Sequence, residues 1–169
     1  MKVLISEEEI AKEVQSIAGE LNGQYAGQEV ILVTILKGSI CFLADLIRHL
    51  EFPFQLEFVT CSSYGMLGTK PGELTLSGFD SLDIQGKHVL LIDDIYDTGR
   101  TLSTACHALE EKSPVSLKTL VLLRKKIQHT GDVMPDLVCF DIEDHFVVGY
   151  GLDHKEHLRG LKDIQIYEE

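Results

Sequence analysis

The chain is built around one buried strand and the turn that follows it, Val89-Leu90-Leu91-Ile92-Asp93-Asp94-Ile95-Tyr96-Asp97-Thr98-Gly99-Arg100-Thr101-Leu102. Its first four residues are all apolar, which is typical of a strand buried on both faces of a parallel sheet. Three carboxylates follow within five residues, and Thr-Gly-Arg-Thr then opens a helix. Because open α/β sheets bind ligands at the carboxyl ends of their strands, we expect a functional site at this point.

The turn at residues 98–101 has the features of a phosphate site. It offers backbone N–H groups at a helix N-terminus, where the helix dipole favours an anion, and Gly99 has no side chain to keep a phosphate away. Thr98 and Thr101 add hydroxyl donors. The nearby carboxylates would repel a phosphate unless they face sugar hydroxyls or a divalent cation. We therefore expect a sugar phosphate that binds together with Mg²⁺.

A purely structural interpretation of these residues is also available. Asp93 and Asp94 could be the polar end of a strand, with Asp97 or Thr98 as the cap of a helix, and Thr-Gly-Arg-Thr alone is a common helix start. Nothing structural requires three carboxylates within five residues at the end of a buried strand. The functional interpretation is therefore favoured.

Composition places the chain among globular proteins. Its 169 residues, 44% apolar and 25% charged, suit a single domain over residues 1–169. A net charge of −12 argues against nucleic-acid partners and anionic membranes, which bind basic surfaces. No apolar run is long enough for a membrane span. The apolar stretch at the N-terminus is too short for the hydrophobic region of a signal peptide, so we expect a cytoplasmic protein. The cysteines lack disulfide or zinc spacing and are interpreted as buried thiols: Cys41, Cys61, Cys106 and Cys139.

Strands alternate with helices along the chain, which predicts an α/β fold with a mainly parallel sheet and right-handed crossovers. A capping box at Ser6 to Glu9 opens a helix that Asn22-Gly23 should end. Lys37-Gly38-Ser39 forms a turn between a strand and a helix, and one side of this helix should carry Leu43, Leu46, Ile47 and Leu50. The expected strands cover 30–36, 54–62, 89–92, 117–123, 137–140 and 146–148, and a further helix covers 101–112.

Residues 63–75 are rich in glycine and should form a mobile loop. The simpler alternative is a hairpin tip without function. The functional one is a lid that closes over the reaction and excludes water from an activated sugar.

The stretch Leu91 to Thr101 closely resembles the phosphoribosyl pyrophosphate (PRPP) signature of the type I phosphoribosyltransferases. The resemblance implies a central sheet flanked by helices, a small hood built from the chain ends, and a lid at 63–75 that carries Ser63 and Tyr64. Leu36-Lys37-Gly38-Ser39 resembles the pyrophosphate loop of the purine enzymes, in which the peptide before the lysine is often cis. The PRPP-binding residues that the resemblance implies are Lys37, Gly38, Ser39, Asp93, Asp94, Ile95, Asp97, Thr98, Gly99, Arg100, Thr101 and Arg159.

The segment Phe146 to Asp153 resembles the base-binding segment of the hypoxanthine-guanine members of this family, and residues 140–169 would form a purine-binding hood. The resemblance implies that Phe146 stacks on the purine, that the backbone of Val147 pairs with the base edge, and that Lys125 donates to the 6-oxo group. Asp153 would lie near the base and the metal. His154 and His157 could form a metal pair, but surface histidines with charged neighbours are usually solvated.

The resemblance implies a purine-salvage transferase that moves the 5-phosphoribosyl group from PRPP to N9 of hypoxanthine or guanine and releases pyrophosphate. Asp97 would be the catalytic residue that accepts the purine N7 proton. Asp93, Asp94 and Asp153 would hold Mg²⁺. The partners would be PRPP and a 6-oxopurine, and self-association as a homodimer or homotetramer is expected. Two alternatives stay open: an enzyme for xanthine or a pyrimidine, and a PRPP-sensing regulator that reads nucleic acid.

Overall fold

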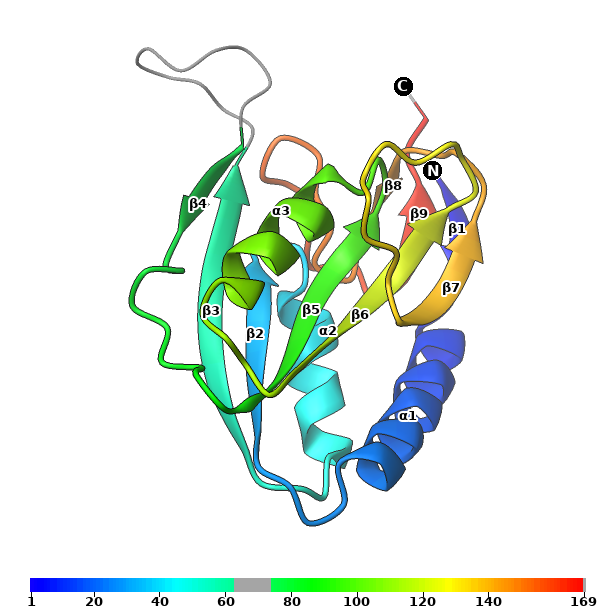
Figure 1. Ribbon diagram of the computed structural model, residues 1–169. Coiled ribbons are helices and arrows are strands. Elements are labelled where there is room, and N and C mark those ends of the chain that lie inside the picture. Colours follow the sequence, from blue (N-terminus) through cyan, green and yellow to red (C-terminus); the bar gives the residue numbers. More distant parts are fainter. Residues whose placement is uncertain (63–73, 169) are drawn as a thin grey trace.

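The computed structural model describes residues 1–62 and 74–168. Its main sheet has six strands in the order β4-β3-β2-β5-β6-β7, and all pairs are parallel except β3 with β4 (Figure 1). The strands of this sheet are β2 (Val30–Leu36), β3 (Phe54–Ser62), β4 (Thr75–Ser77), β5 (His88–Tyr96), β6 (Ser116–Lys125) and β7 (Leu137–Ile142).

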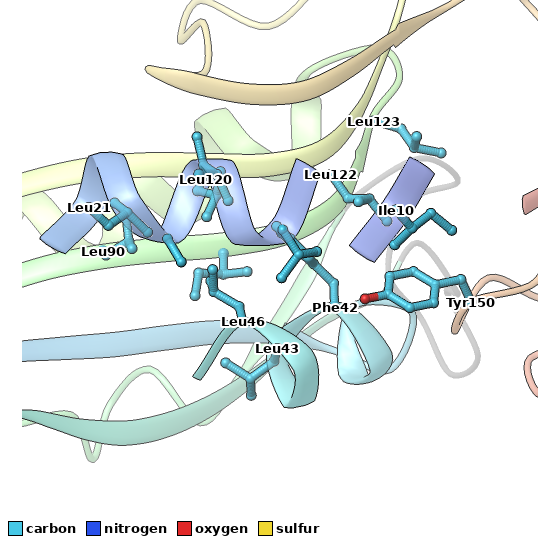
Figure 2. Packing of buried hydrophobic residues seen from close by; sticks show 14 of the residues in the cluster. Ile10, Leu21, Phe42, Leu43, Leu46, Leu90, Leu120, Leu122, Leu123 and Tyr150 are labelled. Carbon is cyan, nitrogen blue, oxygen red and sulfur yellow. The ribbon is translucent and has the colours of Figure 1, made fainter. Parts of the chain in front are cut away.

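Helices cover both faces of the sheet (Figure 1). They are α1 (Glu7–Gln24), α2 (Ile40–Leu46) with the 3-10 turn η1 (Ile47–His49) after it, and α3 (Arg100–Glu110). α1 and α2 pack with one set of alternating strand residues, such as Leu32 and Leu90. Figure 2 shows part of this core, including Leu90. α3 packs on the opposite set, such as Val33 and Leu91. β5 is therefore apolar on both faces because it is a central strand that helices cover on both sides.

The two chain ends meet in a second, smaller sheet. β1 (Lys2–Ile5), β9 (Ile164–Ile166) and β8 (Val147–Val148) form an antiparallel sheet in the order β1-β9-β8. Ile5, Val147 and Ile164 join the core beneath α1 and α2. This sheet lies in the segment predicted to form the hood, and its strand β8 lies directly after Phe146, the residue predicted to stack on the purine.

The predicted elements are present, with four differences in detail besides shifts of a few residues at the ends of elements. α1 continues through Asn22 and Gly23 to Gln24, because the buried Tyr25 caps it with an N–H bond to Leu21 O and packs on Phe52. The helix after Ser39 ends at Leu46 and tightens into η1. Short strands β1, β4 and β9 were not expected. Of the four cysteines, all free, only Cys106 is fully buried, while the other three are half-buried.

The predicted lid at 63–75 falls mostly outside the described residues, which omit 63–73. Ser63 and Tyr64 belong to the omitted part. Among the helices of the described ranges, none has the length and apolar character that crossing a membrane requires.

Candidate active site

The end of β5 and the start of α3 form the wall of a cleft of about 260 Å³. Gly99 makes the connection in the left-handed region, at φ +86°, where a residue with a Cβ would be strained. A Cβ there would also lie 2.6 Å from the Tyr96 hydroxyl, which donates to Val133 O over 2.8 Å. The first N–H groups of a helix have no partners within the helix, although the N–H of Arg100 donates to Thr98 Oγ1 over 3.4 Å. This is the geometry expected of a phosphate cradle.

The loop after β2 forms the opposite wall. The Leu36–Lys37 peptide is cis. A Cβ built on Gly38 would overlap Asp94 Oδ2, so only glycine allows this turn to approach the carboxylate so closely. Ser39 is fully buried, and its hydroxyl donates to Ile35 O, so this hydroxyl serves the turn itself.

Two adjacent carboxylates lie at the bottom of the cleft. Asp93 is 5% exposed and its Oδ1 accepts the N–H of Asp94, while Asp94 Oδ1 accepts the N–H of Ile95. Burial, and then the neighbouring charge of Asp94, raises the pKa of Asp93 well above its usual range. Burial also raises the pKa of Asp94, and hydrogen bonds and the charge of Arg159 partly oppose this rise. A cation or a set of hydroxyl donors would relieve this buried negative charge.

Asp97 and Lys125 meet at the upper edge of the cleft. Lys125 Nζ lies 3.3 Å from Asp97 Oδ2 and 3.0 Å from Asp144 Oδ1, and its side chain is only 11% exposed. Burial alone would lower the pKa of Lys125, but the hydrogen bond to Asp144 and the charge of Asp97 raise it above its ordinary value. Lys125 is therefore a charged donor beside the aspartate predicted to be the catalytic residue.

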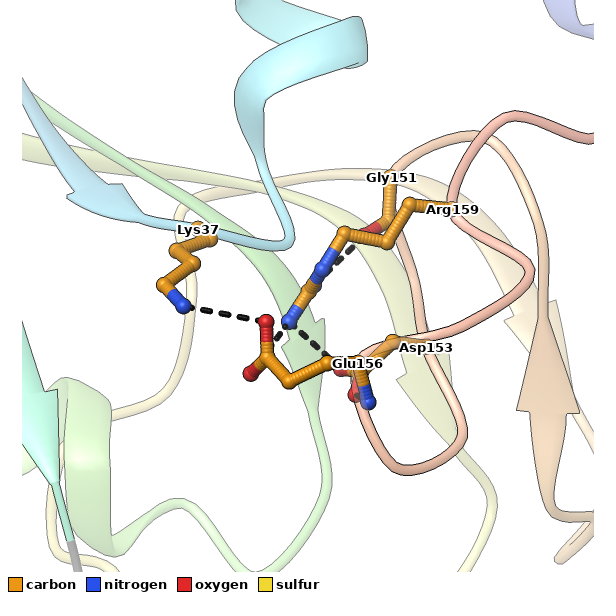
Figure 3. Close-up of polar contacts among 5 residues, drawn as sticks. All are labelled: Lys37, Gly151, Asp153, Glu156 and Arg159. Carbon is orange, nitrogen blue, oxygen red and sulfur yellow. Dashed lines mark hydrogen bonds and ion pairs between the residues drawn. The ribbon is translucent and has the colours of Figure 1, made fainter.

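A network of charges joins the β2–α2 loop to the hood (Figure 3). Lys37 Nζ lies 3.0 Å from Glu156 Oε2. Arg159 Nη2 lies 2.9 Å from Asp153 Oδ1 and 3.2 Å from Glu156 Oε1, and its Nη1 donates to Gly151 O over 2.8 Å. The hydrogen bond from Lys37 lowers the pKa of Glu156. Asp153, predicted to be a metal ligand, is thus paired with Arg159 in this structure.

The hood carries an exposed aromatic ring. Phe146 is 54% exposed, and its ring meets those of His154 and Tyr167 edge-on, with centroids 5.6 and 5.9 Å away. His154 is stacked on Tyr167 at 4.4 Å, and its backbone pairs with that of His157. A large exposed aromatic ring suits stacking on a flat heterocycle. Val147 is buried in β8, where its side chain belongs to the core.

A segment that sequence reasoning overlooked supports the cradle from behind. His129 Nδ1 donates to Asp97 O over 2.6 Å, and its ring lies 4.5 Å from that of Tyr96. The N–H groups of Thr130 and Gly131 both donate to Thr98 O. These contacts fix the backbone that carries Asp97.

The donor set determines what metal could bind here. Within residues 1–62 and 74–168, no group of three or more His, Cys, Asp or Glu side chains is arranged to hold an ion. Asp93 and Asp94 nevertheless offer carboxylate oxygens, and Mg²⁺ in proteins is commonly held by one or two carboxylates together with substrate phosphates. The residues therefore fit a magnesium ion that shares its ligands with a bound phosphate compound.

The structure brings most of the predicted site residues to one place. The cleft is lined by Lys37, Gly38, Asp93, Asp94, Ile95, Asp97, Thr98, Gly99 and Thr101, together with Ile35, Leu36, Cys61, Tyr96 and Leu102. Lys125 contacts the lining residue Asp97, and Arg159 is connected to the lining residue Lys37 through Glu156. Five other predicted residues do not line it, although Arg100 begins α3: Ser39, Arg100, Phe146, Val147 and Asp153. A hollow of about 670 Å³ between α1, α2 and residues 159–162 contains only Arg159 of the predicted set, so volume alone does not identify the site.

Known proteins resemble this chain over nearly its full length. Residues 4–155 match the family model described as phosphoribosyl transferase domain. Hypoxanthine-guanine phosphoribosyltransferases of Streptococcus pneumoniae and Bacillus subtilis are 39% and 38% identical, over 99% and 98% of this chain and 93% and 92% of theirs.

Solved structures of phosphoribosyltransferases have the same fold as this chain. A hypoxanthine-guanine phosphoribosyltransferase from Bacillus anthracis superposes with a TM-score of 0.91 at 34% identity, over 99% of both chains. A hypoxanthine phosphoribosyltransferase from Trypanosoma cruzi gives 0.90 at 35% identity, over 99% of this chain and 95% of that one. The cleft between the β5–α3 turn and the β2–α2 loop lies within the matched region. The chain therefore belongs to the phosphoribosyl transferase family.

Proposed function

We propose that this protein is a purine-salvage enzyme that transfers the 5-phosphoribosyl group from PRPP to N9 of hypoxanthine or guanine and releases pyrophosphate. The observation that carries the proposal is the position of Asp97, which belongs to the cradle for the sugar phosphate and also lies 3.3 Å from Lys125. One carboxylate thus lies between the sugar and the base. The relatives named above support the same reaction.

The base is selected by Lys125 and Phe146. Phe146 offers its exposed face for stacking on the purine, while Val147 pairs through its backbone with the base edge. The charged ammonium of Lys125 donates to the 6-oxo group. An adenine would place an amino group against the ammonium, so Lys125 would lose its acceptor on the base, and binding sites discriminate strongly against such an analogue.

Charge develops in two places during the transfer. The bond between the anomeric carbon and pyrophosphate breaks as N9 approaches, so the ribose becomes cationic and the pyrophosphate gains negative charge. Asp93 and Asp94 bind the ribose hydroxyls and face the cationic ring. Asp97 accepts the N7 proton of the purine. Lys37, the Gly38 N–H and Arg159 stabilise the leaving pyrophosphate.

Magnesium, when bound, supplies positive charge to the pyrophosphate oxygens. Asp93 and Asp94 would hold it together with the substrate. Asp153 would contribute only after it releases Arg159, because the two groups are ion-paired at 2.9 Å.

One assay tests the proposal. The protein is incubated with PRPP, Mg²⁺ and, in turn, hypoxanthine, guanine, xanthine, adenine and uracil, and nucleotide is detected by chromatography. We expect product with hypoxanthine, guanine or both, and none when a chelator removes the cation. Product with xanthine or uracil alone would favour the alternative enzymes. No nucleotide with any base would favour a PRPP-sensing regulator.

Two further expectations concern the protein in the cell. It acts in the cytoplasm, and copies of the chain associate as a homodimer or homotetramer. Cell fractionation tests the location, and light scattering of the purified protein gives the number of chains.

A further inference from the structure

The predicted pyrophosphate loop, Leu36 to Ser39, already forms an ion pair with a carboxylate of the same chain. The carboxylate of Glu156 lies between two cations that we assign to pyrophosphate, with Oε2 at 3.0 Å from Lys37 Nζ and Oε1 at 3.2 Å from Arg159 Nη2 (Figure 3). The bond to Glu156 Oε2 is the one hydrogen bond that Lys37 Nζ makes within the described ranges. Glu156 thus occupies a position suited to a phosphate oxygen.

The fold holds Glu156 there. The turn at residues 154–157 is closed by two backbone hydrogen bonds between His154 and His157, of 2.9 and 3.0 Å. The N–H of Glu156 donates to Asp153 Oδ2 over 2.8 Å, and its backbone has φ +66°. Asp153 in turn is paired with Arg159. The carboxylate is therefore presented by a defined turn.

A pyrophosphate and Glu156 cannot use the same cations together. Both are negatively charged at neutral pH, and two anions within a few ångströms of one another repel. Binding of pyrophosphate to Lys37 and Arg159 therefore requires Glu156 to leave. Asp153 and the Gly151 carbonyl still hold Arg159 when it does, so the loss of Glu156 leaves that guanidinium in place.

We propose that Glu156 is an internal competitor of pyrophosphate, which occupies the anion position between Lys37 and Arg159 in the free enzyme and returns to it when pyrophosphate departs. The residue weakens the binding of pyrophosphate and hastens its release. This inference rests on the proposed function, because it assigns Lys37 and Arg159 to the leaving group.

The test compares Glu156→Gln with Glu143→Gln. Glu143 is a matched control, since its carboxylate also lies 3.0 Å from a lysine, Lys126, and is 66% exposed against 64% for Glu156. Calorimetry measures the binding of inorganic pyrophosphate with Mg²⁺ to each whole protein, and kinetics measures pyrophosphate inhibition. An exposed ion pair corresponds to at most about a fivefold change in an equilibrium constant, so we expect pyrophosphate to bind more tightly to Glu156→Gln, by up to about fivefold. Glu143→Gln should match the unaltered protein.

Unchanged binding of pyrophosphate to Glu156→Gln would overturn the proposal, because Glu156 would then not compete. Weaker binding would also overturn it, because Glu156 would then serve to hold Arg159 in position. An equal gain in Glu143→Gln would also overturn it, since the effect would then be general electrostatics. Glu156→Ala provides a second variant with the same expected gain. If the unaltered protein forms no nucleotide, the proposed function fails. If it forms nucleotide while pyrophosphate affinity is insensitive to residue 156, only the role of Glu156 fails.

Discussion

Asp97 is the residue on which the proposed chemistry depends most directly. Replacement by Asn keeps the shape of the side chain and removes its ability to accept a proton. Because positioned general bases contribute about 10²–10⁴-fold, kcat should fall by that factor while the KM for PRPP changes little. Steady-state kinetics with hypoxanthine measures both quantities. A variant with undiminished turnover would exclude Asp97 as the base.

Lys125 should act on the base rather than on the sugar. Lys125→Ala removes a charged donor, and such hydrogen bonds correspond to about ten- to a hundredfold in affinity, so the KM for the purine should rise by that much while the KM for PRPP is retained. Lys126→Ala is the control, because Lys126 is exposed and paired only with Glu143 in the described part of the chain. Equal purine KM values in the two variants would remove Lys125 from the pocket.

The buried Asp93 should cost stability at neutral pH. Burial raises its pKa, so the folded protein disfavours the ionised form. The contribution of Asp93 to stability is then greatest below the unfolded pKa of about 4 and is lost as the pH rises through the higher folded value. Urea unfolding should show Asp93→Asn to be more stable than the unaltered protein at pH 7, with the difference shrinking as the pH falls.

The control for this measurement is Asp83→Asn, since Asp83 is exposed and paired with Lys87, and such pairs contribute little. A lower stability of Asp93→Asn at pH 7 would contradict the direction of the pKa shift. Loss of PRPP turnover in the same variant is expected, because a proposed ligand for ribose and metal is removed.

The site residues that could be predicted from the sequence to lie together are those that belong to one local motif. Asp93 to Thr101 form one strand, turn and helix start, so their spacing alone places them together. Lys125 and Arg159 came from the family resemblance. Asp144, Glu156 and His129 were not assigned roles, because their contacts with Lys125, Lys37 and Asp97 join segments whose approach only the folded chain determines.

At the scale of elements, the β2–α2 loop should tolerate no side chain at Gly38. Gly38→Ala would place a Cβ on Asp94 Oδ2 and force that carboxylate away from the cleft. Misplacement of this size typically costs on the order of a hundredfold, which should appear in kcat/KM for PRPP. Full activity in the Gly38→Ala variant would show that Asp94 does not need this position.

The matched change is Gly19→Ala in α1, where a Cβ would meet nothing within 4 Å. Alanine favours a helix over glycine by about 0.5–1 kcal/mol, so this variant should unfold at higher urea concentration and keep its activity. The pair separates the effect of a methyl group on a helix from its effect on the site.

Elements with a strong hydrophobic pattern were predicted well, whereas the short strands β1, β4 and β9 were not predicted. The continuous apolar runs of β2, β5 and β6 and the capping box of α1 are local signals. β1 and β9 pair residues from opposite ends of the chain, such as Lys2 with Ile166, and strands this short carry too few residues for a pattern. The hood was expected only because the family resemblance implied it.

At the scale of the whole molecule, an acidic protein has to bind an acidic substrate. The net charge of −12 repels PRPP at a distance, although the proposed pyrophosphate and phosphate ligands, Lys37, Arg159 and the first turn of α3, would attract it locally. The Debye length falls from about 30 Å at 0.01 M salt to about 10 Å at 0.1 M, so added salt screens the distant repulsion before it screens the site.

We therefore expect kcat/KM for PRPP to rise between about 0.01 and 0.1 M ionic strength at constant free Mg²⁺, the range over which this screening length contracts. The value for hypoxanthine, which is uncharged, should stay level in the same experiments and serves as the control. A decrease for PRPP would mean that the local cations govern the encounter. In that case Lys37→Ala should abolish the salt dependence, whereas a repulsion set by the whole molecule should survive that substitution.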